Sequence, residues 1–190
     1  MKGIRAAALA LAALAWSAEA CAVVSSLLAG KGVATAMDLR SVDEVKTDTE
    51  IDAALKAKFL AEGDDFKTVS ALVFAGRVVL VGFVRSPEVR RRAEDIAKSE
   101  DRYQRFRNAI VVGTIDDNTA ADLALDEKIN LRLTATRGIA SVNMRWKVLG
   151  GNVFIMGLAQ SREEANLAVD TVRRVAGVTR VYPLLDVGKT

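Results

Sequence analysis

The sequence predicts an α+β protein made of two tandem copies of one α-β-β-α-β unit, each a three-stranded sheet packed with two helices. The first observation is an internal repeat, in which residues 47–111 recur loosely as residues 119–187. The second is that apolar residues alternate in the expected strands and return at helical spacing in the expected helices. The strand and turn positions that recur at an offset of 75 are Gly76, Val78, Leu80, Gly82, Ser86 and Ala93, matched by Gly151, Val153, Ile155, Gly157, Ser161 and Ala168.

The first 20 residues have the pattern of a secretory signal peptide. Lys2 and Arg5 precede a short apolar run, residues 6–16, which cannot span a bilayer. The small-residue pattern Ala18-Glu19-Ala20 then marks a cleavage site. We therefore interpret residues 1–20 as a signal peptide.

Cys21 follows the cleavage site directly and is the only cysteine of the chain, so no intrachain disulfide can form. A cysteine at this place is the acceptor for lipoprotein acylation, and each buried methylene of an acyl chain contributes roughly 0.8 kcal/mol to membrane binding. We expect a lipid anchor at Cys21, and Ala22 after it favours the outer membrane. The alternative is ordinary cleavage after Ala20, which leaves a free N-terminal thiol.

Residues 21–45 show no sustained periodicity, and we expect them to form a tether between the anchor and a first domain over residues 46–114. In that domain, Thr47 and Glu50 form a capping-box pattern for a helix over about residues 48–61. Alternating residues predict a hairpin that turns at residues 75–77. Ser86 and Pro87 begin a second helix that runs to about Ser99, and residues 106–112 form the last strand.

The second domain, residues 115–190, repeats this order. We expect a helix over residues 119–135, strands over 142–148 and 153–158, and a turn at residues 150–152 between them. Ser161 and Glu164 cap a helix that runs to about Ala176, and residues 178–187 form the last strand. The helices of each unit should cover one face of its sheet.

Composition argues against nucleic-acid binding and catalysis. Removal of Lys2, Arg5 and Glu19 with the signal peptide leaves 25 basic and 23 acidic residues, too balanced for a nucleic-acid partner. The chain has no histidine, and its one cysteine belongs to the expected anchor. Paired carboxylates such as Asp64-Asp65 fall at helix ends, where capping explains them. We expect no catalytic residues, no metal and no cofactor.

The pattern Gly-x-Val-x-Leu-x-Gly-x-Val-x-Ser over residues 76–86, its partner over 151–161 and the closing segment 176–181 resemble the BON domain family. Two such domains behind a lipoprotein signal resemble the tandem-BON outer-membrane lipoproteins associated with cell division and outer-membrane stress. This resemblance implies binding of anionic phospholipid through the first helix of the second domain, and a role in envelope integrity. The family places an aromatic residue near the start of that helix, where this chain has Ala124.

The same helix, residues 119–135, also supports a lipid site by its own pattern. The inward stripe leaves Leu123 and Leu131 about 160 to 200 degrees away, at 100 degrees per residue, and they should face outward. Lys128 and Arg132 flank them, which would place cations beside lipid phosphates. The alternative is that Leu123 and Leu131 pack against the first domain. The inward stripe consists of Leu125, Ile129 and Leu133.

These observations predict a non-enzymatic, lipid-anchored protein that binds anionic phospholipid at the periplasmic face of the outer membrane and supports envelope integrity. One alternative is a soluble periplasmic osmotic-stress protein or chaperone. Another is an adaptor that binds proteins of an envelope complex.

Overall fold

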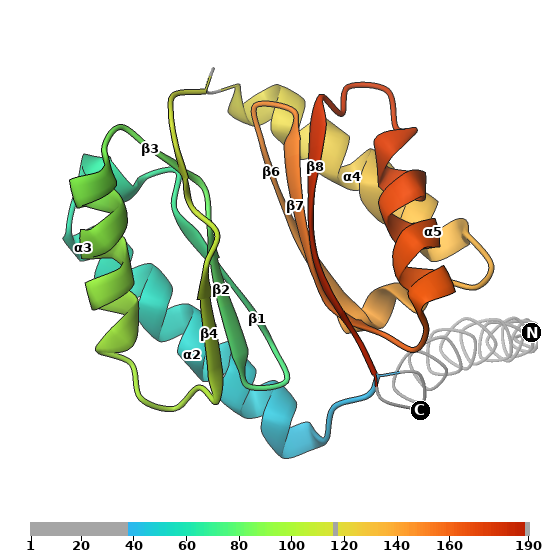
Figure 1. The fold of residues 1–190 in the computed structure, drawn as a ribbon, viewed down its shortest axis with the longest axis horizontal. Helices are drawn as coiled ribbons and strands as arrows, with labels where there is room; N and C mark the ends of the chain where they lie inside the picture. Colours follow the sequence, from blue (N-terminus) through green and yellow to red (C-terminus); the bar gives the residue numbers. More distant parts are fainter. Residues whose placement is uncertain (1–37, 116–117, 189–190) are drawn as a thin grey trace, which may run out of the picture. The chain divides into compact units, whose positions relative to one another are not determined.

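The computed structural model describes residues 38–115 and 118–188, and both copies of the repeat lie within them. Each copy folds as a helix, an antiparallel hairpin, a second helix and a strand that pairs in parallel with the hairpin (Figure 1). The predicted α+β fold, with two three-stranded sheets each packed with helices, is confirmed.

In the first domain, β1 and β2 form the hairpin and β4 pairs with β2 in parallel. The short strands β3 and β5 continue this sheet as a separate parallel pair. The elements are α2 (Val42–Ala61), η1 (Asp64–Phe66), β1 (Ser70–Phe74), β2 (Arg77–Val81), β3 (Phe83–Val84), α3 (Pro87–Lys98), β4 (Arg105–Asn108) and β5 (Val111–Val112).

In the second domain, β6 and β7 form the hairpin and β8 pairs with β7 in parallel. Here each of the last two strands is continuous over eight residues. The elements are α4 (Thr119–Ala135), η2 (Ser141–Asn143), β6 (Met144–Leu149), β7 (Asn152–Ala159), α5 (Arg162–Arg173) and β8 (Arg180–Val187).

The first helix begins earlier than the sequence pattern predicted. The capping box is formed by Ser41 and Glu44, because the Ser41 Oγ accepts from the Glu44 N–H and the Glu44 carboxylate accepts from the Ser41 N–H at 2.8 Å. The Thr47 and Glu50 pattern therefore lies inside the helix and does not cap it. No helix breaker separates the two patterns, so the upstream cap sets the start and α2 takes in residues 42–45, which we had assigned to the tether.

The strand glycines Gly82 and Gly157 occupy corresponding places, with φ of 135° and 137°. A Cβ atom at either position would lie 2.2 Å from the Thr68 carbonyl oxygen or 2.1 Å from the Asn143 carbonyl oxygen. The absence of a side chain at these glycines therefore allows a neighbouring backbone segment to approach closely. In the first domain Gly82 separates β2 from β3.

The two sheets pack against each other, and the helices cover their outer faces (Figure 1). Side chains of β2 alternate between two cores: Val78 and Leu80 face α2 and α3, whereas Val79 and Val81 face the other sheet. Because both faces of the central strands are buried, their sequences are continuously apolar. The core between the sheets contains Leu72, Phe74, Val79, Val81, Phe83, Phe154, Met156 and Leu184.

Candidate functional site

Helix α4 is held on the second domain by the three residues predicted for its inward stripe. Leu125, Ile129 and Leu133 are 5%, 0% and 0% exposed and belong to the core between α4, α5 and the sheet. Burying side chains of this size contributes roughly 1.5–3 kcal/mol each, which fixes the rotation of the helix about its axis. The opposite face must then point away from the domain.

The N-terminal turn of α4 is tied to the β6–β7 hairpin by Asp122. Its carboxylate accepts hydrogen bonds from the N–H groups of Gly150 at 2.7 Å and Gly151 at 3.1 Å. Asp48 in α2 makes the same contacts with the β1–β2 turn at 2.8 and 2.9 Å. The repeat thus preserves a carboxylate that satisfies the turn backbone and sets the position of each first helix.

Leu123 and Leu131 are 68% and 61% exposed, so the prediction that they face outward is confirmed. The alternative prediction, that they pack against the first domain, is wrong, because the first domain contacts the second through its sheet. Lys128 and Arg132 are also exposed, and neither forms an ion pair within the described residues. The two leucines and Lys128 share one broad face of α4, and Arg132 lies at its flank.

This face also carries an acidic residue. Glu127 is exposed and lies between the angular positions of Leu123 and Leu131. Asp126 lies towards the core, where burial raises the pKa of its carboxyl and a hydrogen bond with Trp146 partly opposes that shift. The outward surface of α4 therefore combines two apolar side chains, two cations and one carboxylate.

The corresponding helix of the first domain presents a different surface. At the offset of 74, Thr49 and Ala57 stand where α4 has Leu123 and Leu131. The exposed large apolar residues of α2, Val42 and Leu60, lie near its two ends. The outward leucine pair is therefore a property of the second domain.

Cys21, the expected site of acylation, lies outside the residues that the structure describes, and its modification stays a prediction. Within residues 38–115 and 118–188, no cluster of His, Cys, Asp and Glu has the arrangement of a metal site. No helix in the same residues has the length and hydropathy needed to cross a membrane.

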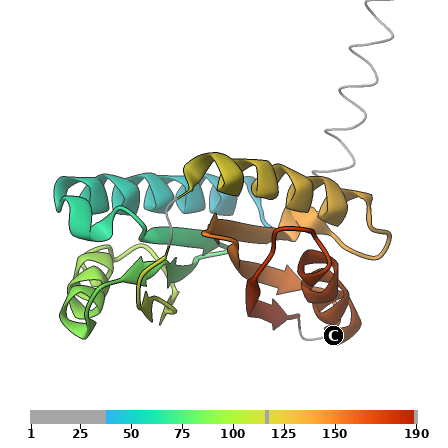
Figure 2. The same ribbon diagram turned by 90° about the horizontal axis from the view of Figure 1, so that it is seen from above.

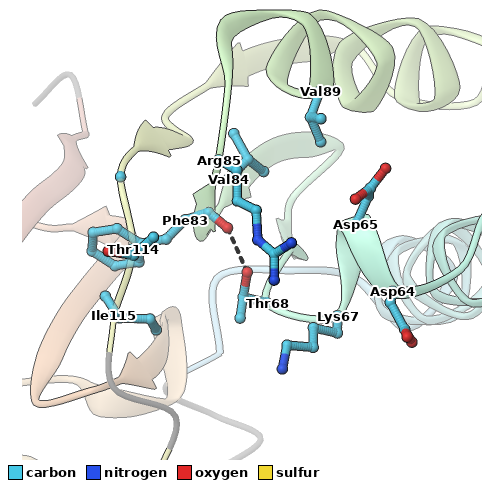
Figure 3. Close-up of a pocket in the computed structure, with 11 residues that line it drawn as sticks. Asp64, Asp65, Lys67, Thr68, Phe83, Val84, Arg85, Val89, Thr114 and Ile115 are labelled. Atoms are coloured by element: carbon cyan, nitrogen blue, oxygen red, sulfur yellow. Dashed lines mark hydrogen bonds between the residues drawn. The ribbon is translucent and has the colours of Figure 1, made fainter.

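A small cavity of about 130 Å³ lies beside η1 and β3 (Figure 3). Figure 3 shows Arg85 extending past Thr68 towards Lys67, and the Thr68 hydroxyl donating to the Phe83 carbonyl. Asp64 and Asp65 also line the cavity, so its two cations are matched by two carboxylates. Its volume is below the roughly 300–1,000 Å³ of small-molecule sites, and its charges favour neither anions nor cations.

Comparison with known proteins agrees with the fold. The BON domain matches residues 47–114 and 121–189, which correspond to the two structural repeats. The chain belongs to the BON domain family. BON domains are non-catalytic, and the comparison finds no enzyme family.

One relative of the chain is a protein of Anaplasma centrale described as an uncharacterized protein in the gshII 5′ region. It is 36% identical over 137 residues, which cover 68% of this chain and 90% of the relative.

The chain matches two solved structures of CdsD, a structural protein of the type III secretion system of Chlamydia trachomatis. The match to its C-terminal domain has a TM-score of 0.31 and 15% identity, and covers 75% of this chain and 67% of that one. The second has a TM-score of 0.27 and 15% identity, and covers 72% of this chain but 64% of that one.

Sequence reasoning found the surface of α4 but missed the burial of both sheet faces. The signal was present in the continuous apolar runs of residues 78–81 and 153–156, which are typical of strands covered on both sides. The sequence also gave no indication of the role of Arg40, which the structure places in a buried ion-pair network.

Proposed function

We propose that this BON-domain protein binds anionic phospholipid surfaces through the outward face of α4, and that an acylated Cys21 anchors it at the periplasmic face of the outer membrane. In this proposal its role is to support envelope integrity, without catalysis. BON domains are associated with membranes and phospholipids in general. The observation that carries the proposal is the exposure of Leu123 and Leu131 at 68% and 61% beside Lys128 and Arg132.

The two kinds of side chain would act together at a membrane surface. Exposed leucines can enter the interface between headgroups and acyl chains, where their apolar area leaves water. Lys128 and Arg132 would contact lipid phosphates, each contributing roughly 1 kcal/mol on an anionic surface, and salt would screen that term. Two leucines and two cations make a weak site alone, and the anchor would raise the local concentration of lipid.

Vesicle co-sedimentation of the full chain tests the lipid site. Binding to phosphatidylglycerol vesicles should exceed binding to phosphatidylcholine vesicles and should weaken with salt. The paired variants Leu123→Ser/Leu131→Ser and Lys128→Glu/Arg132→Glu should each reduce binding by about 30-fold, because each pair removes on the order of 2 kcal/mol, or about 1 kcal/mol per residue.

Matched controls use other parts of the described surface. Val42→Ser removes an apolar residue that is even more exposed, at 82%, and Arg174→Glu reverses an exposed cation at the end of α5. Both should retain binding. Equal losses in the controls and the α4 variants, or no loss in the α4 variants, would refute α4 as the lipid site.

The anchor needs a separate test. The intact mass of the membrane-extracted protein should exceed that of the cleaved chain by a diacylglyceryl-type modification, and Cys21→Ala should remove the increase. An unmodified chain that begins at Cys21 and is found in the soluble periplasm would refute the lipid anchor. That result would favour the alternative function of a soluble periplasmic stress protein or chaperone. Retained membrane attachment without any binding to protein-free vesicles would favour the adaptor role.

A further inference from the structure

We propose that the free edge of β4 binds an extended acidic segment of a partner protein, which pairs with β4 as an added strand and places its carboxylates beside Arg105 and Arg107. In the strand order β1-β2-β4, β4 has a neighbouring strand on one side only. Its other side presents backbone N–H and C=O groups that can pair with a further strand.

Arginines gather on one face of this edge around a single carboxylate. Arg105 and Arg107 are exposed, and their register partners in β2 are Arg77 and Val79, so they lie on the face of the sheet that carries Arg77. The charged groups that act on the Arg77 guanidinium are Asp186, Arg105 and Arg107. Burial and the two neighbouring arginines lower the pKa of Arg77, although Asp186 opposes that shift. Three guanidinium groups against one carboxylate leave an excess positive charge at this edge.

This excess charge faces solvent. The Asp186 carboxylate is held by Arg77 at 2.7 Å and approached by Arg105 at 3.5 Å, and the Arg105 side chain is 65% exposed. Arg107 forms no ion pair within residues 38–115 and 118–188. Arginine binds carboxylates well because its planar guanidinium can donate two parallel hydrogen bonds. The edge is therefore suited to additional carboxylates from a partner.

The spacing of the two arginines matches that of a paired strand. Because they are two residues apart in β4, their side chains leave the same face about 7 Å from each other. An added strand would place its own alternate side chains opposite them. Phe106, between the arginines, packs half-buried on the other face against the first-domain core. The expected partner sequence is thus acidic, apolar, acidic, with the apolar residue beside Phe106.

The backbone of β4 is open to pairing, whereas the corresponding edge of the second domain is blocked. The N–H of Ala109 donates to the Leu80 carbonyl in β2, so the N–H of Asn108 points to the free side. At the equivalent place, opposite Ile155 of β7, β8 has Pro183. Proline has no N–H to donate and is typical of protected edge strands. The repeat therefore leaves the edge open in the first domain only.

The edge of β4 lies on the side of the sheets away from α4. Helix α2 packs on β1 and α4 packs on β6, and β4 and β8 are the opposite edges of the two sheets. Figure 2 shows α2 and α4 along one side, with β4 and β8 on the other. A protein bound to lipid through α4 would turn β4 towards water, where a partner protein can reach it. Only this location of the partner rests on the proposed function.

The test is fluorescence anisotropy of a labelled peptide of about eight residues in which glutamate alternates with valine, titrated with the full chain. The peptide should bind saturably, and the same peptide with lysine in place of glutamate should not. Arg105→Glu/Arg107→Glu should weaken the affinity by about tenfold, because two attractive contacts become repulsive. Arg173→Glu/Arg174→Glu changes the net charge equally at the exposed end of α5 and should keep the wild-type affinity.

A second pair of variants tests the backbone pairing separately from the charges. Asn108→Pro removes the outward N–H and should weaken binding by about tenfold, although both arginines remain. Pro183 shows that the fold accommodates a proline at this place of the repeat. Asn108→Ala is the control, because it loses the same side-chain hydrogen bonds to the Arg90 carbonyl and Glu94 but keeps the N–H. It should bind the peptide as the wild-type protein does.

The lipid surface and the β4 edge can fail independently. Lys128→Glu/Arg132→Glu should leave peptide binding unchanged, and Arg105→Glu/Arg107→Glu should leave binding to phosphatidylglycerol vesicles unchanged, which also shows that the variant is folded. Loss of vesicle binding in Arg105→Glu/Arg107→Glu would assign these arginines to lipid and overturn the proposal. Absence of saturable peptide binding, or equal affinity in the wild-type protein, Arg105→Glu/Arg107→Glu and Asn108→Pro, would overturn it as well.

Discussion

The Nη1 atom of Arg77 lies 2.7 Å from the Oδ2 atom of Asp186, and this ion pair joins β2 of the first BON domain to β8 of the second. Arg105 approaches the same carboxylate oxygen at 3.5 Å. Nearby, Phe154 stacks on Tyr182 with ring centroids 4.4 Å apart, and Phe83 meets both rings edge-on. The two domains therefore share a packed interface with a specific polar contact at its margin.

We predict that Asp186→Ala lowers the free energy of unfolding by about 1–2 kcal/mol, because it leaves the Arg77 guanidinium largely buried without its partner. The Arg77 side chain is only 10% exposed, and the 39% exposure of Asp186 moderates the loss. Urea unfolding of the full chain measures the change.

The control is Asp170→Ala, which removes a surface pair with Arg173 whose side chains are 54% and 57% exposed. This substitution should change the unfolding free energy by no more than about 0.5 kcal/mol. Equal effects of the two substitutions would show that the contact between β2 and β8 contributes no more than a surface pair.

A glycine series should separate backbone strain from steric conflict. Gly157→Ala should destabilise by at least about 3 kcal/mol, because the new Cβ would lie 2.1 Å from the Asn143 carbonyl oxygen at a φ of 137°. Gly138→Ala, at a φ of 90° with its nearest contact at 3.5 Å, should cost about 1–2 kcal/mol. Thermal unfolding of each variant gives the ranking.

Gly113→Ala completes the series, since a Cβ at this position meets nothing within 4 Å and the backbone is not in the left-handed region. It should be within about 0.5 kcal/mol of the wild-type protein. If Gly157→Ala were as mild as Gly113→Ala, the close approach of the Asn143 backbone would not be needed for the fold.

The stability of the first domain should also fall in acid because of Glu100. The hydrogen bond from Arg102, with Nε 2.6 Å from the carboxylate, holds the pKa of Glu100 below its usual 4.5, although burial opposes the shift. A carboxyl whose pKa is lower in the folded state stabilises the protein above its unfolded-state pKa. That stabilisation is lost as pH falls through the folded-state pKa.

Urea unfolding at a series of pH values tests this sign. Glu100→Gln should be less stable than the wild-type protein near neutral pH, and the difference should shrink as the pH decreases. A difference that stays constant from neutral to acid pH would mean that ionised Glu100 is not the stabilising form.

The sequence allowed the internal order of each domain to be predicted, because each element carries its own local pattern. The inward stripe of α4 and the outward positions of Leu123 and Leu131 follow from helical periodicity alone. The continuous apolar runs of β2 and β7 indicate that both sheet faces are covered, but the surface that covers the second face lies far away in the chain and has no local pattern of its own. Val78 to Val81 alternate between two cores, so the expectation that helices cover one face of each sheet accounts for only one of these cores.

The start of α2 is a different kind of case, because two capping-box patterns compete within ten residues. The Ser41–Glu44 box caps the helix, and Arg40, directly before it, adds an ion pair with Asp48 inside the helix. Asp48 also accepts hydrogen bonds from the N–H groups of Ala75 and Gly76. This network therefore links the first turns of α2 to the β1–β2 turn and favours the upstream of the two capping-box patterns.

Arg40 should therefore contribute more to stability than an ordinary surface arginine. Its guanidinium pairs with Asp38 at 2.9 Å and Asp48 at 3.0 Å, and its Cζ lies 4.5 Å from the centre of the Phe74 ring. Arg40→Ala should lower the free energy of unfolding by about 2–3 kcal/mol, because Asp48 is 4% exposed and loses its charged partner. Chemical denaturation of the full chain measures this loss.

Arg40→Lys tests whether the planar guanidinium matters beyond its charge. Lysine keeps one positive charge but cannot bond two carboxylates in the same fork or stack on Phe74, so this variant should lose roughly half as much stability as Arg40→Ala. Arg91→Ala is the control, because Arg91 pairs with Glu88 at side-chain exposures of 74% and 66% and should contribute no more than about 0.5 kcal/mol. If Arg40→Lys were as stable as the wild-type protein, the effect of Arg40 would come from its charge alone. If Arg40→Ala lost as little stability as Arg91→Ala, Arg40 would not contribute to the stability of this end of α2.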